Sequence, residues 1–377
     1  MASWLLLPLL LLAADACMRP PSSPTTTTTT TSSAPRCNFY GPSSTTPTKV
    51  NQLRPGDIGI IGSIGDSDSA AFGARASTLL TITQEDRDIS FASGTSEDWE
   101  GQTSLANMIA QYNPDLVGGS PGSNNLLFSQ DHQTSQGLNY AVSGAWANTA
   151  PDQADKLMAG IKQVDEWQSK WKLITVQFGG NDLCAASCET DPSSEYFGDA
   201  TVAGWRSNMD LVLSKLSTMP RTLVVFTESF MPGKLHDMVR PSWTCNLALT
   251  FGCPCITRDN LAEMTQMRDD YSSELRSLAA KYRNSDFGVE VVPALVGLYP
   301  NATAGGPDAS YLAPDCFHFN AQLHSMVSRV SNFWHRVDFD IQNRICFESF
   351  VSYEVRNMAN INPCQMNWIN LNDSTSF

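Results

Sequence analysis

The chain has 377 residues, of which 42% are hydrophobic and 16% are charged, and its formal net charge is −14. This composition is typical of a folded globular protein and excludes a chain that is disordered throughout. The acidic balance excludes nucleic-acid binding through a basic stripe, and it also excludes electrostatic capture by an anionic membrane.

The first 16 residues resemble a secretory signal peptide. An apolar core runs from Trp4 to Ala13, and Ala14 and Ala16 place small residues at positions −3 and −1 of a cut before Cys17. This run is too short to span a bilayer. The polar C-terminal tail does not have the pattern of a lipid-anchor signal. We therefore expect a secreted, extracellular protein without a transmembrane anchor.

Residues 17–48 are rich in Ser, Thr and Pro and have almost no apolar side chains. Such a segment cannot bury enough apolar surface to fold, so we expect a disordered, O-glycosylated linker. The folded domain is expected at 49–345 and a C-terminal extension at 346–377. Asn301 and Asn372 begin glycosylation sequons, which agrees with secretion.

Five apolar runs predict buried strands, and longer amphipathic helices lie between them. The strands are expected at residues 57–64, 137–143, 171–179, 221–229 and 288–295, and the two clearest helices at 151–167 and 260–283. Strands that alternate with helices favour an α/β fold whose parallel sheet is covered on both faces. Ligands of such sheets bind at the carboxyl ends of the strands, so the residues after each strand are the candidates for chemistry.

The ten cysteines predict disulfides, as expected for an exported chain. No pair of His or Cys has the spacing of a zinc site, so no metal is expected. Connectivity cannot be deduced from the sequence, but short spacings resemble local bridges. These are Cys184 with Cys188, and pairing within the group Cys245, Cys253 and Cys255.

The first polar cluster is Gly65-Asp66-Ser67, directly after the first predicted strand. A serine on a strand-to-helix turn exposes its hydroxyl, and the N-terminus of a helix favours an oxyanion near its backbone N–H groups. The alternative is structural, because Asp and Ser are preferred N-cap residues of ordinary helices.

Gly144 and Asn181 follow the second and third predicted strands. A glycine lets the backbone approach a substrate closely and direct an N–H group at it. The side-chain amide of an asparagine can donate to negative charge that develops on an acyl oxygen. Ordinary turn chemistry is the alternative for both residues.

Asp315 and His318 lie three residues apart in the last long loop. In a tight turn both side chains can face one way, so that the carboxylate holds one imidazole nitrogen and leaves the other as a base. The alternatives are a surface salt bridge and a core histidine. A parallel sheet brings all four polar clusters to one edge, which favours a common site.

Ser120 is excluded as a nucleophile, although "GGSPG" matches the G-x-S-x-G pattern of a nucleophile elbow. The oxyanion hole of such an elbow needs the N–H group of the next residue, and Pro121 has none. No predicted strand precedes this segment.

In this order, Ser67, Gly144, Asn181 and His318 match the four blocks of the GDSL, or SGNH, hydrolase family. The stretches "NPDLVGGSPG", "WKLITVQFGGNDLC" and "DCFHFNAQLH" resemble its phospholipase B branch, and the resemblance covers roughly residues 50–335. It implies a three-layer α/β/α sandwich with a mostly parallel, five-stranded, flavodoxin-like sheet. It also implies ester hydrolysis without a metal or an organic cofactor.

The resemblance assigns a role to each matched residue. Ser67 attacks the ester carbonyl, His318 is the general base and Asp315 orients it. The backbone N–H groups of Ser67 and Gly144 form the oxyanion hole together with the side chain of Asn181.

The expected protein is a secreted serine esterase that releases fatty acyl chains from phospholipids and contacts the lipid interface transiently. Asp182 is expected to support the neighbouring asparagine. Two alternatives stay open: a carboxylesterase for other lipids or acetylated sugars, and a catalytically weak binding protein that keeps the fold.

One position departs from the family pattern, because Asp68 stands where leucine usually follows the serine. A carboxylate at ~6 Å from an oxyanion opposes it by roughly 3 kcal/mol at an effective dielectric constant of ~20. This corresponds to about a hundredfold in rate and favours the alternative of a catalytically weak binding protein that keeps the fold. The interpretation we favour is that Asp68 turns to water and stabilises the N-terminus of the helix.

Overall fold

The computed structural model describes residues 41–96, 101–127, 134–189, 191, 198–239, 242–257, 260–293, 301–302, 306–307 and 309–330. The predicted signal peptide, residues 17–40 of the linker, Asn372 and the C-terminal extension lie outside the described residues, as do Cys17, Cys37, Cys346 and Cys364. Residues 41–48 of the predicted linker contact the domain. The Trp171 indole N–H donates to the Pro47 carbonyl at 2.8 Å, and the Ser43 hydroxyl donates to Asp57 at 2.9 Å. The folded part therefore begins ahead of the predicted boundary at residue 49.

Four buried strands form a parallel sheet. They are β1 (Ile58–Gly65), β4 (Trp171–Gln177), β5 (Thr222–Thr227) and β6 (Phe287–Val292), in the order β1-β4-β5-β6. Each neighbouring pair is parallel. Strands that are buried on both faces read as continuous apolar runs, which is why the sequence predicts these four. The α/β fold class is confirmed.

The run at 137–143 lies along the edge of β1 but does not form the fifth regular strand that the sequence predicts. Ser63 donates to the Leu138 carbonyl at 3.0 Å and accepts from the Tyr140 N–H at 2.8 Å, as an isolated parallel bridge. Nearer the start of β1, Ile61 donates instead to Val117 at 2.9 Å. The segment of Val117 and the segment of Leu138 and Tyr140 therefore share this edge, and neither forms a continuous series of strand hydrogen bonds with β1.

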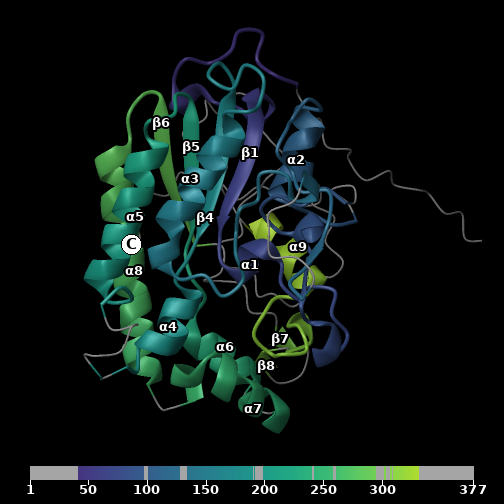
Figure 1. Cartoon of the computed structure of the whole chain (residues 1–377), viewed down its shortest axis with the longest axis vertical. Helices are drawn as coiled ribbons and strands as arrows, with labels where there is room; N and C mark the ends of the chain where they lie inside the picture. The colour runs from purple at the N-terminus through teal and green to yellow at the C-terminus, as the bar shows by residue number, and fades with distance from the viewer. Residues whose placement is uncertain are drawn as a thin grey trace, which may run out of the picture. The chain divides into compact units, whose positions relative to one another are not determined.

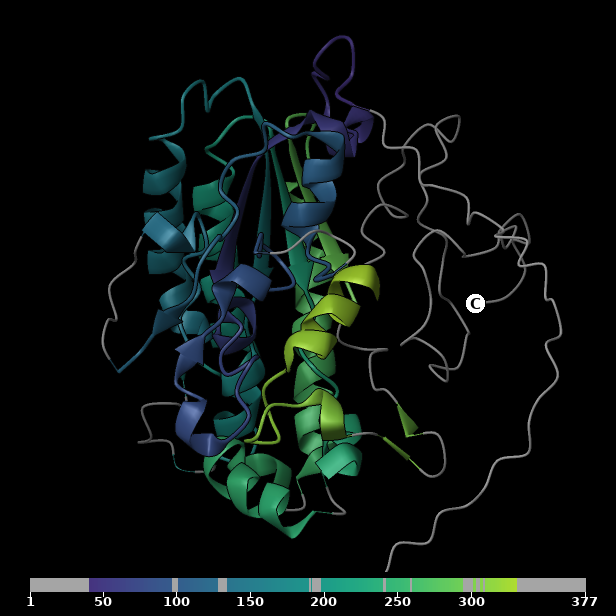
Figure 2. The same ribbon diagram turned by 90° about the vertical axis from the view of Figure 1, so that its right-hand side faces the viewer.

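Helices cover both faces of the sheet and make the three layers of an α/β/α sandwich (Figures 1 and 2). One face carries α3 (Ala150–Ile161), α5 (Val202–Leu216) and α8 (Leu261–Tyr282), and the other carries α2 (Leu105–Tyr112) and α9 (Ala321–Val330). The order of the strands in the sheet is also their order along the chain, so each connection leads to the next strand on the same side. Because such connections are right-handed, the helices α3, α5 and α8 that they contain lie on the same face of the sheet.

Shorter elements gather at the carboxyl ends of the strands, at the bottom of Figure 1. They are α4 (Gly180–Ala186), α6 (Pro232–Val239) and α7 (Trp243–Gly252), while α1 (Ser67–Ala70) follows β1 directly. Two small antiparallel pairs are also present: β2 (Gln84–Glu85) with β3 (Asn124–Asn125), and β7 (Asn301–Ala302) with β8 (Gly306–Pro307). Among all these helices, none has the length and apolar character needed to cross a bilayer.

The two predicted helices are present, and one is shorter than expected. α8 spans Leu261–Tyr282, close to the predicted range 260–283. α3 ends at Ile161 instead of 167, and the chain then turns through Glu166, whose φ is +58°. Val164 therefore lies outside the helix, although it still packs against the core.

The end of β1 is fixed tightly at Gly65. A Cβ atom there would lie 2.3 Å from the Ser69 hydroxyl oxygen and 2.6 Å from the Gln177 carbonyl oxygen. The side chain of Gln153, on α3, accepts from the Gly65 N–H at 2.9 Å and donates to the Gly65 carbonyl at 3.0 Å. The two residues that follow, Asp66 and Ser67, consequently leave the sheet from a fixed point.

Candidate active site

The structure brings Ser67, Asp315 and His318 together, although 251 positions separate Ser67 from His318. The Nε2 atom of His318 lies 2.8 Å from Ser67 Oγ, and its Nδ1 atom lies 2.5 Å from Asp315 Oδ2. A carboxylate at Nδ1 holds a proton there and leaves Nε2 to accept one. The arrangement can thus draw a proton from the serine hydroxyl.

Ser67 is the first residue of α1, and the preceding Asp66 is the N-cap. Asp66 Oδ1 accepts from the Asp68 N–H at 3.0 Å, while Gln177, at the end of β4, donates to Asp66 Oδ2 at 3.3 Å. Since Asp66 provides the cap, the Ser67 hydroxyl remains available to His318. Within the described part of the chain, nothing accepts a hydrogen bond from the Ser67 backbone N–H.

The loop of His318 is shaped by its own aspartate. Asp315 Oδ1 accepts from the backbone N–H groups of Phe317 and His318, both at 3.1 Å. The rings of Phe72 and Phe317 pack against the imidazole, with centroids 4.7 and 5.0 Å from its centre. These contacts set the direction in which the imidazole points.

The charges of this pair are complementary. Burial lowers the pKa of His318, but the hydrogen bond and charge of Asp315 and the charge of Asp68 outweigh it, so the pKa lies above its ordinary value. Burial raises the pKa of Asp315, but His318 and two backbone N–H groups outweigh that effect and lower it. An ionised carboxylate therefore faces an imidazole that accepts protons readily.

Gly144 and Asn181 border the same cavity as Ser67. Gly144 has a φ of +78°, and a Cβ atom there would meet nothing within 4 Å. A glycine is therefore favoured at this position by the backbone conformation and not by lack of space for a side chain. Asn181 donates one amide hydrogen to the Ala145 carbonyl at 2.8 Å, which leaves the other for a ligand. With the Ser67 N–H, these groups form an arrangement suited to bind an oxyanion.

A buried polar network holds the segment that precedes Gly144. Arg87 donates to Glu85 at 2.6 Å, to Asn139 Oδ1 at 3.1 Å and to the Ala141 carbonyl at 2.8 Å. Glu85 in turn accepts from the Ser143 hydroxyl at 2.7 Å. The sequence alone does not reveal this network, because no local pattern links residues 85–87 with residues 139–143.

Asp182 supports the same region from the other side. Its carboxylate accepts from the Ala147 N–H at 3.2 and 3.3 Å, and burial raises the pKa of Asp182 to about 7. The Asp182 carboxylate thus fixes the chain just beyond Ala145, the residue to which Asn181 donates.

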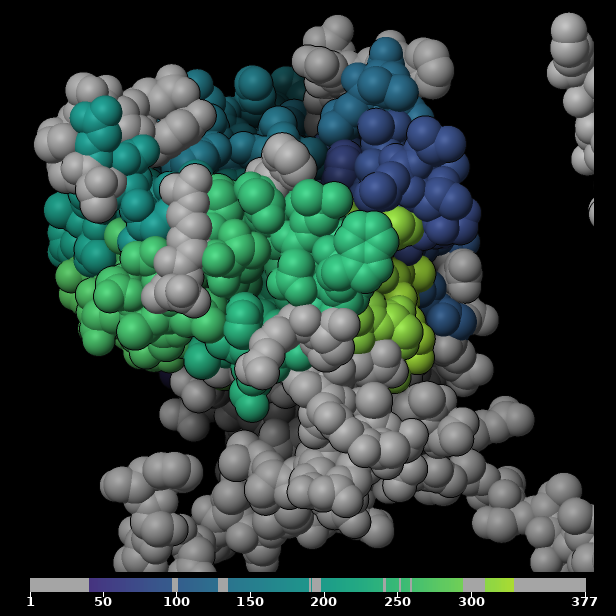
Figure 3. Space-filling model, turned by 90° about the horizontal axis from the view of Figure 1, so that it is seen from below, coloured from purple at the N-terminus to yellow at the C-terminus, as the bar shows by residue number. Residues whose placement is uncertain are grey.

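The cavity in front of Ser67 has a volume of about 290 Å³. Its lining residues are Ser67, Phe72, Ser143, Gly144, Asn181, Ala248, Gly252, Asp315, Phe317 and His318. The lining includes polar groups and an apolar part, which comprises Phe72, Phe317 and the α7 residues Ala248 and Gly252. Figure 3, which views the carboxyl ends of the strands, shows α7 in green beside the purple segment that follows β1 and the yellow segment of His318.

The disulfides differ from the predicted local bridges. Among the described residues, they join Cys184 to Cys253, Cys188 to Cys255, and Cys245 to Cys316. Cys184 lies in α4, and Cys188 lies in the turn just after α4 ends at Ala186. Both are bonded to one neighbouring segment, which includes η7 (Pro254–Thr257). The short spacing therefore indicates a shared partner segment and not a bond between the two cysteines.

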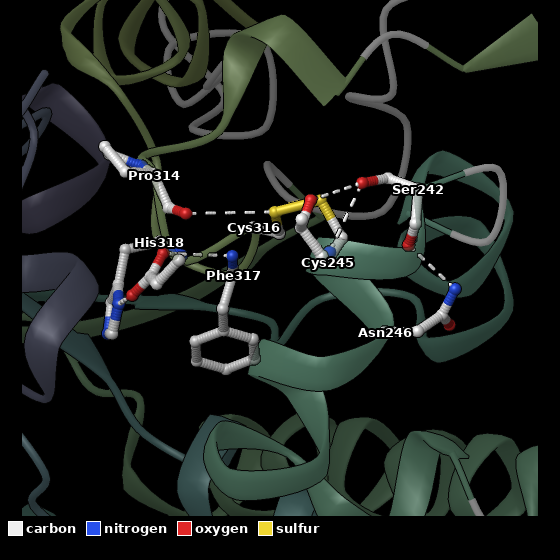
Figure 4. Close-up of a disulfide and its surroundings, with 9 residues drawn as sticks. Ser242, Cys245, Asn246, Pro314, Cys316, Phe317 and His318 are labelled. Atoms are coloured by element: carbon white, nitrogen blue, oxygen red, sulfur yellow. Dashed lines mark hydrogen bonds and ion pairs between the residues drawn. A yellow bond between two sulfur atoms is a disulfide. The ribbon is translucent and has the colours of Figure 1, made fainter. Parts of the chain in front are cut away.

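The third disulfide links α7 to the loop of His318 (Figure 4). Cys316 lies between Asp315 and Phe317 and adopts a φ of +61°, a conformation that non-glycine residues rarely adopt. The disulfide thus holds the wall of the cavity against the turn that carries the imidazole. Sequence analysis could not find α7 as part of the site, because spacing alone does not show that Cys245 pairs with Cys316.

Two further expectations concern Asp68 and Ser120. Asp68 does not turn to water: it is 7% exposed, because aromatic and aliphatic side chains of the His318 loop and α6 enclose it. Ser120 is fully buried and donates to the Gln136 carbonyl at 2.7 Å, away from the cavity. Across the described ranges, no group of three or more His, Cys, Asp or Glu side chains is arranged to hold a metal ion.

Comparison with known proteins gives two findings. The model of the family described as GDSL-like Lipase/Acylhydrolase matches residues 61–330. The chain is also similar to "Phospholipase B1, membrane-associated" from Mus musculus, Rattus norvegicus and Homo sapiens, with 33%, 32% and 31% identity over 77% of this chain. The chain spans about a fifth of the length of these relatives, since the matches cover 20% of each.

The Cys245–Cys316 disulfide predicts a local effect on His318. Serine substitution of both Cys245 and Cys316 should lower the free energy of unfolding by about 4 kcal/mol, because a long loop is released. It should also speed amide hydrogen exchange at Phe317 and His318 in the native state.

The matched control is the pair Cys188→Ser and Cys255→Ser. Its sequence separation is 67 residues, against 71 for the first pair, so the loss of stability should be similar. Exchange at Phe317 and His318 should stay slow in the control. Equal exchange rates in the two double variants would show that Cys245–Cys316 has no special effect on the loop.

Proposed function

This chain belongs to the GDSL-like lipase/acylhydrolase family, and from this premise we propose that it is a serine esterase that hydrolyses fatty acyl esters of phospholipids. The observation that carries the proposal is the contact of His318 with both Ser67 and Asp315. The similarity to relatives named phospholipase B1 supports the choice of substrate.

In the proposed first step, Ser67 Oγ attacks the carbonyl carbon of the ester while His318 Nε2 takes the hydroxyl proton. The carbonyl oxygen becomes an oxyanion. The backbone N–H groups of Ser67 and Gly144 and the free amide hydrogen of Asn181 stabilise this charge. Asp315 remains ionised and stabilises the imidazolium.

Collapse of the tetrahedral intermediate breaks the bond to the alcohol, which takes the proton from His318 Nε2 and leaves as the deacylated lipid. The acyl group stays on Ser67 Oγ. A water molecule then attacks the acyl carbonyl and gives a proton to His318. The second collapse releases the fatty acid, and the proton returns to Ser67 Oγ, so that the enzyme is regenerated.

The lining of the cavity supports a lipid substrate. Phe72, Phe317 and the α7 residues Ala248 and Gly252 add an apolar lining to the polar groups of the cavity. An acyl chain placed against this lining loses its contact with water, which favours binding by roughly 25 cal/mol for each Å² of apolar surface. Esters of acetylated sugars would not use this lining.

The outer face of α7 supports contact with a lipid interface. Trp243 is 77% exposed and Leu247 is 55% exposed, and the ten residues of α7 include no charged side chain. Tryptophan is favoured at the boundary between lipid and water. Because α7 also lines the cavity, a lipid bound on its outer face is next to the proposed reaction site.

The same proposal includes export and glycosylation. The three disulfides support an oxidising compartment such as the extracellular space. We propose a signal peptide at residues 1–16, an O-glycosylated linker after it, and N-glycosylation at Asn301 and Asn372.

Ser67→Ala should lower kcat for phosphatidylcholine at least about a thousandfold, because no nucleophile remains to form the acyl-enzyme. Release of fatty acid and lysophospholipid, followed by mass spectrometry, measures the effect. Ser120→Ala is the matched control, and a folded Ser120→Ala protein should retain its turnover. Turnover of acetylated sugars without any turnover of phospholipids would contradict the proposed substrate class.

Serine substitution of both Trp243 and Leu247 should lower turnover of phosphatidylcholine vesicles by about tenfold or more, because two apolar anchors are lost. Turnover of a short, water-soluble ester should not change. The control is Leu211→Ser, which removes a 47% exposed leucine from α5, away from α7. It should change the turnover of neither substrate. An equal loss on both substrates would indicate damage to the reaction site and would contradict an interfacial role of α7.

A further inference from the structure

We propose that Asp68 is a positioning residue that acts on His318 through space, so that its charge controls when the imidazole gives up its proton and becomes a base for Ser67. The inference deepens the proposed function and rests on it. It concerns the position at which this chain departs from the usual leucine.

Asp68 follows Ser67 in α1, but its side chain does not line the cavity in front of the serine. It borders a second, small cavity beneath the His318 loop. The other lining residues are Phe230, Leu235, Met238, Leu312, Phe317, Phe319 and Leu323. Asp68 thus lines the same cavity as Phe317 and Phe319, the two chain neighbours of His318. The Asp68 carboxylate and the imidazole are close enough for their charges to interact.

The Asp68 carboxylate has little solvation. Its Oδ1 atom is buried, and no described residue donates a hydrogen bond to it. The small cavity has a volume of about 10 Å³, which is room for one water molecule at most. Burial raises the pKa of Asp68 to about 6. The charge of His318 lowers this pKa, and the charge of Asp315 raises it.

The ionisable groups around Asp68 come from three elements. Asp66 faces it from the cap of α1, and burial and the Asp68 charge hold the pKa of Asp66 well above its usual range. Asp315 and His318 face it from the last loop. On α9, burial and the His318 charge lower the pKa of His324 to about 3, so His324 stays neutral. On α6, Lys234 and Asp237 are exposed and His236 is half-buried, whereas Leu235 and Met238 are buried.

Two protons are therefore coupled at this site. At low pH, Asp68 is neutral and His318 is cationic, and Ser67 has no base. The first proton can leave from either group. If it leaves from His318, the base is formed; if it leaves from Asp68, the new negative charge holds the remaining proton on His318. Asp68 thus delays formation of the base to higher pH.

The charge of Asp68 has opposite effects on the transition state. It stabilises the imidazolium and opposes the oxyanion, so the two effects partly cancel at the plateau of activity. The charge of Asp68 therefore shows in the pH at which activity falls on the acid side of the pH profile, which we call the acid limb. It does not show clearly in the maximal activity. Asp68→Leu is expected to keep or raise maximal turnover.

The test is the pH dependence of kcat/KM for a soluble ester with the full chain. Asp68→Asn keeps the shape of the side chain and removes its charge, so the acid limb should move to lower pH by about one unit. This corresponds to about tenfold higher kcat/KM on that limb. Asp237→Asn, an exposed carboxylate on α6, is the control and should leave the profile unchanged. An unmoved acid limb in Asp68→Asn would overturn the proposal.

A second readout does not depend on catalysis. In a ¹⁵N-labelled chain, the imidazole resonances of His318 should titrate at lower pH in Asp68→Asn than in the wild type. If Asp68→Asn does not fold, Asp68→Leu, which adds an apolar side chain to an apolar cavity, serves for both measurements. An identical titration of His318 with and without the carboxylate rejects the inference. If the wild type hydrolyses no ester, the proposed function fails, while the resonance titration still decides the role of Asp68.

Discussion

The hydrogen bond between Ser67 Oγ and His318 Nε2 connects the end of the first strand with the last loop of the described chain, and the geometry of the site depends on it. Each partner is held by separate contacts. Gln153 and Gln177 fix the turn before Ser67, and the Cys245–Cys316 disulfide holds the loop of His318 against α7. A change in either support moves one half of the pair relative to the other.

The parallel sheet explains why such distant residues meet. β1 and β4 end side by side, and Ser67 and Asn181 each follow one of these ends. Gly144 reaches the same place along the edge of β1 that does not pair with β4, where Val142 donates to the Gly65 carbonyl at 3.0 Å. The edge segment is irregular, and this irregularity allows the chain to turn at Gly144 with its N–H group unpaired by any described residue.

The sequence predicts well what depends on local pattern. The four strands are buried on both faces and show as apolar runs, and Ser67, Gly144 and Asn181 follow such runs. It predicts poorly what depends on packing between distant segments. Local polarity suggested an exposed Asp68, but the His318 loop and α6 enclose it. The short spacing of Cys184 and Cys188 suggested a local bridge, but Cys184 is bonded to Cys253 and Cys188 to Cys255.

Covalent labelling with a fluorophosphonate probe shows whether His318 makes Ser67 a nucleophile. We expect one adduct per chain, found on Ser67 by peptide mapping, and slow labelling in a folded His318→Gln variant. The leaving group departs as Ser67 Oγ bonds to phosphorus, so the reaction does not depend on the identity of the natural lipid. A chain that never labels, or an adduct on another serine, would contradict the account.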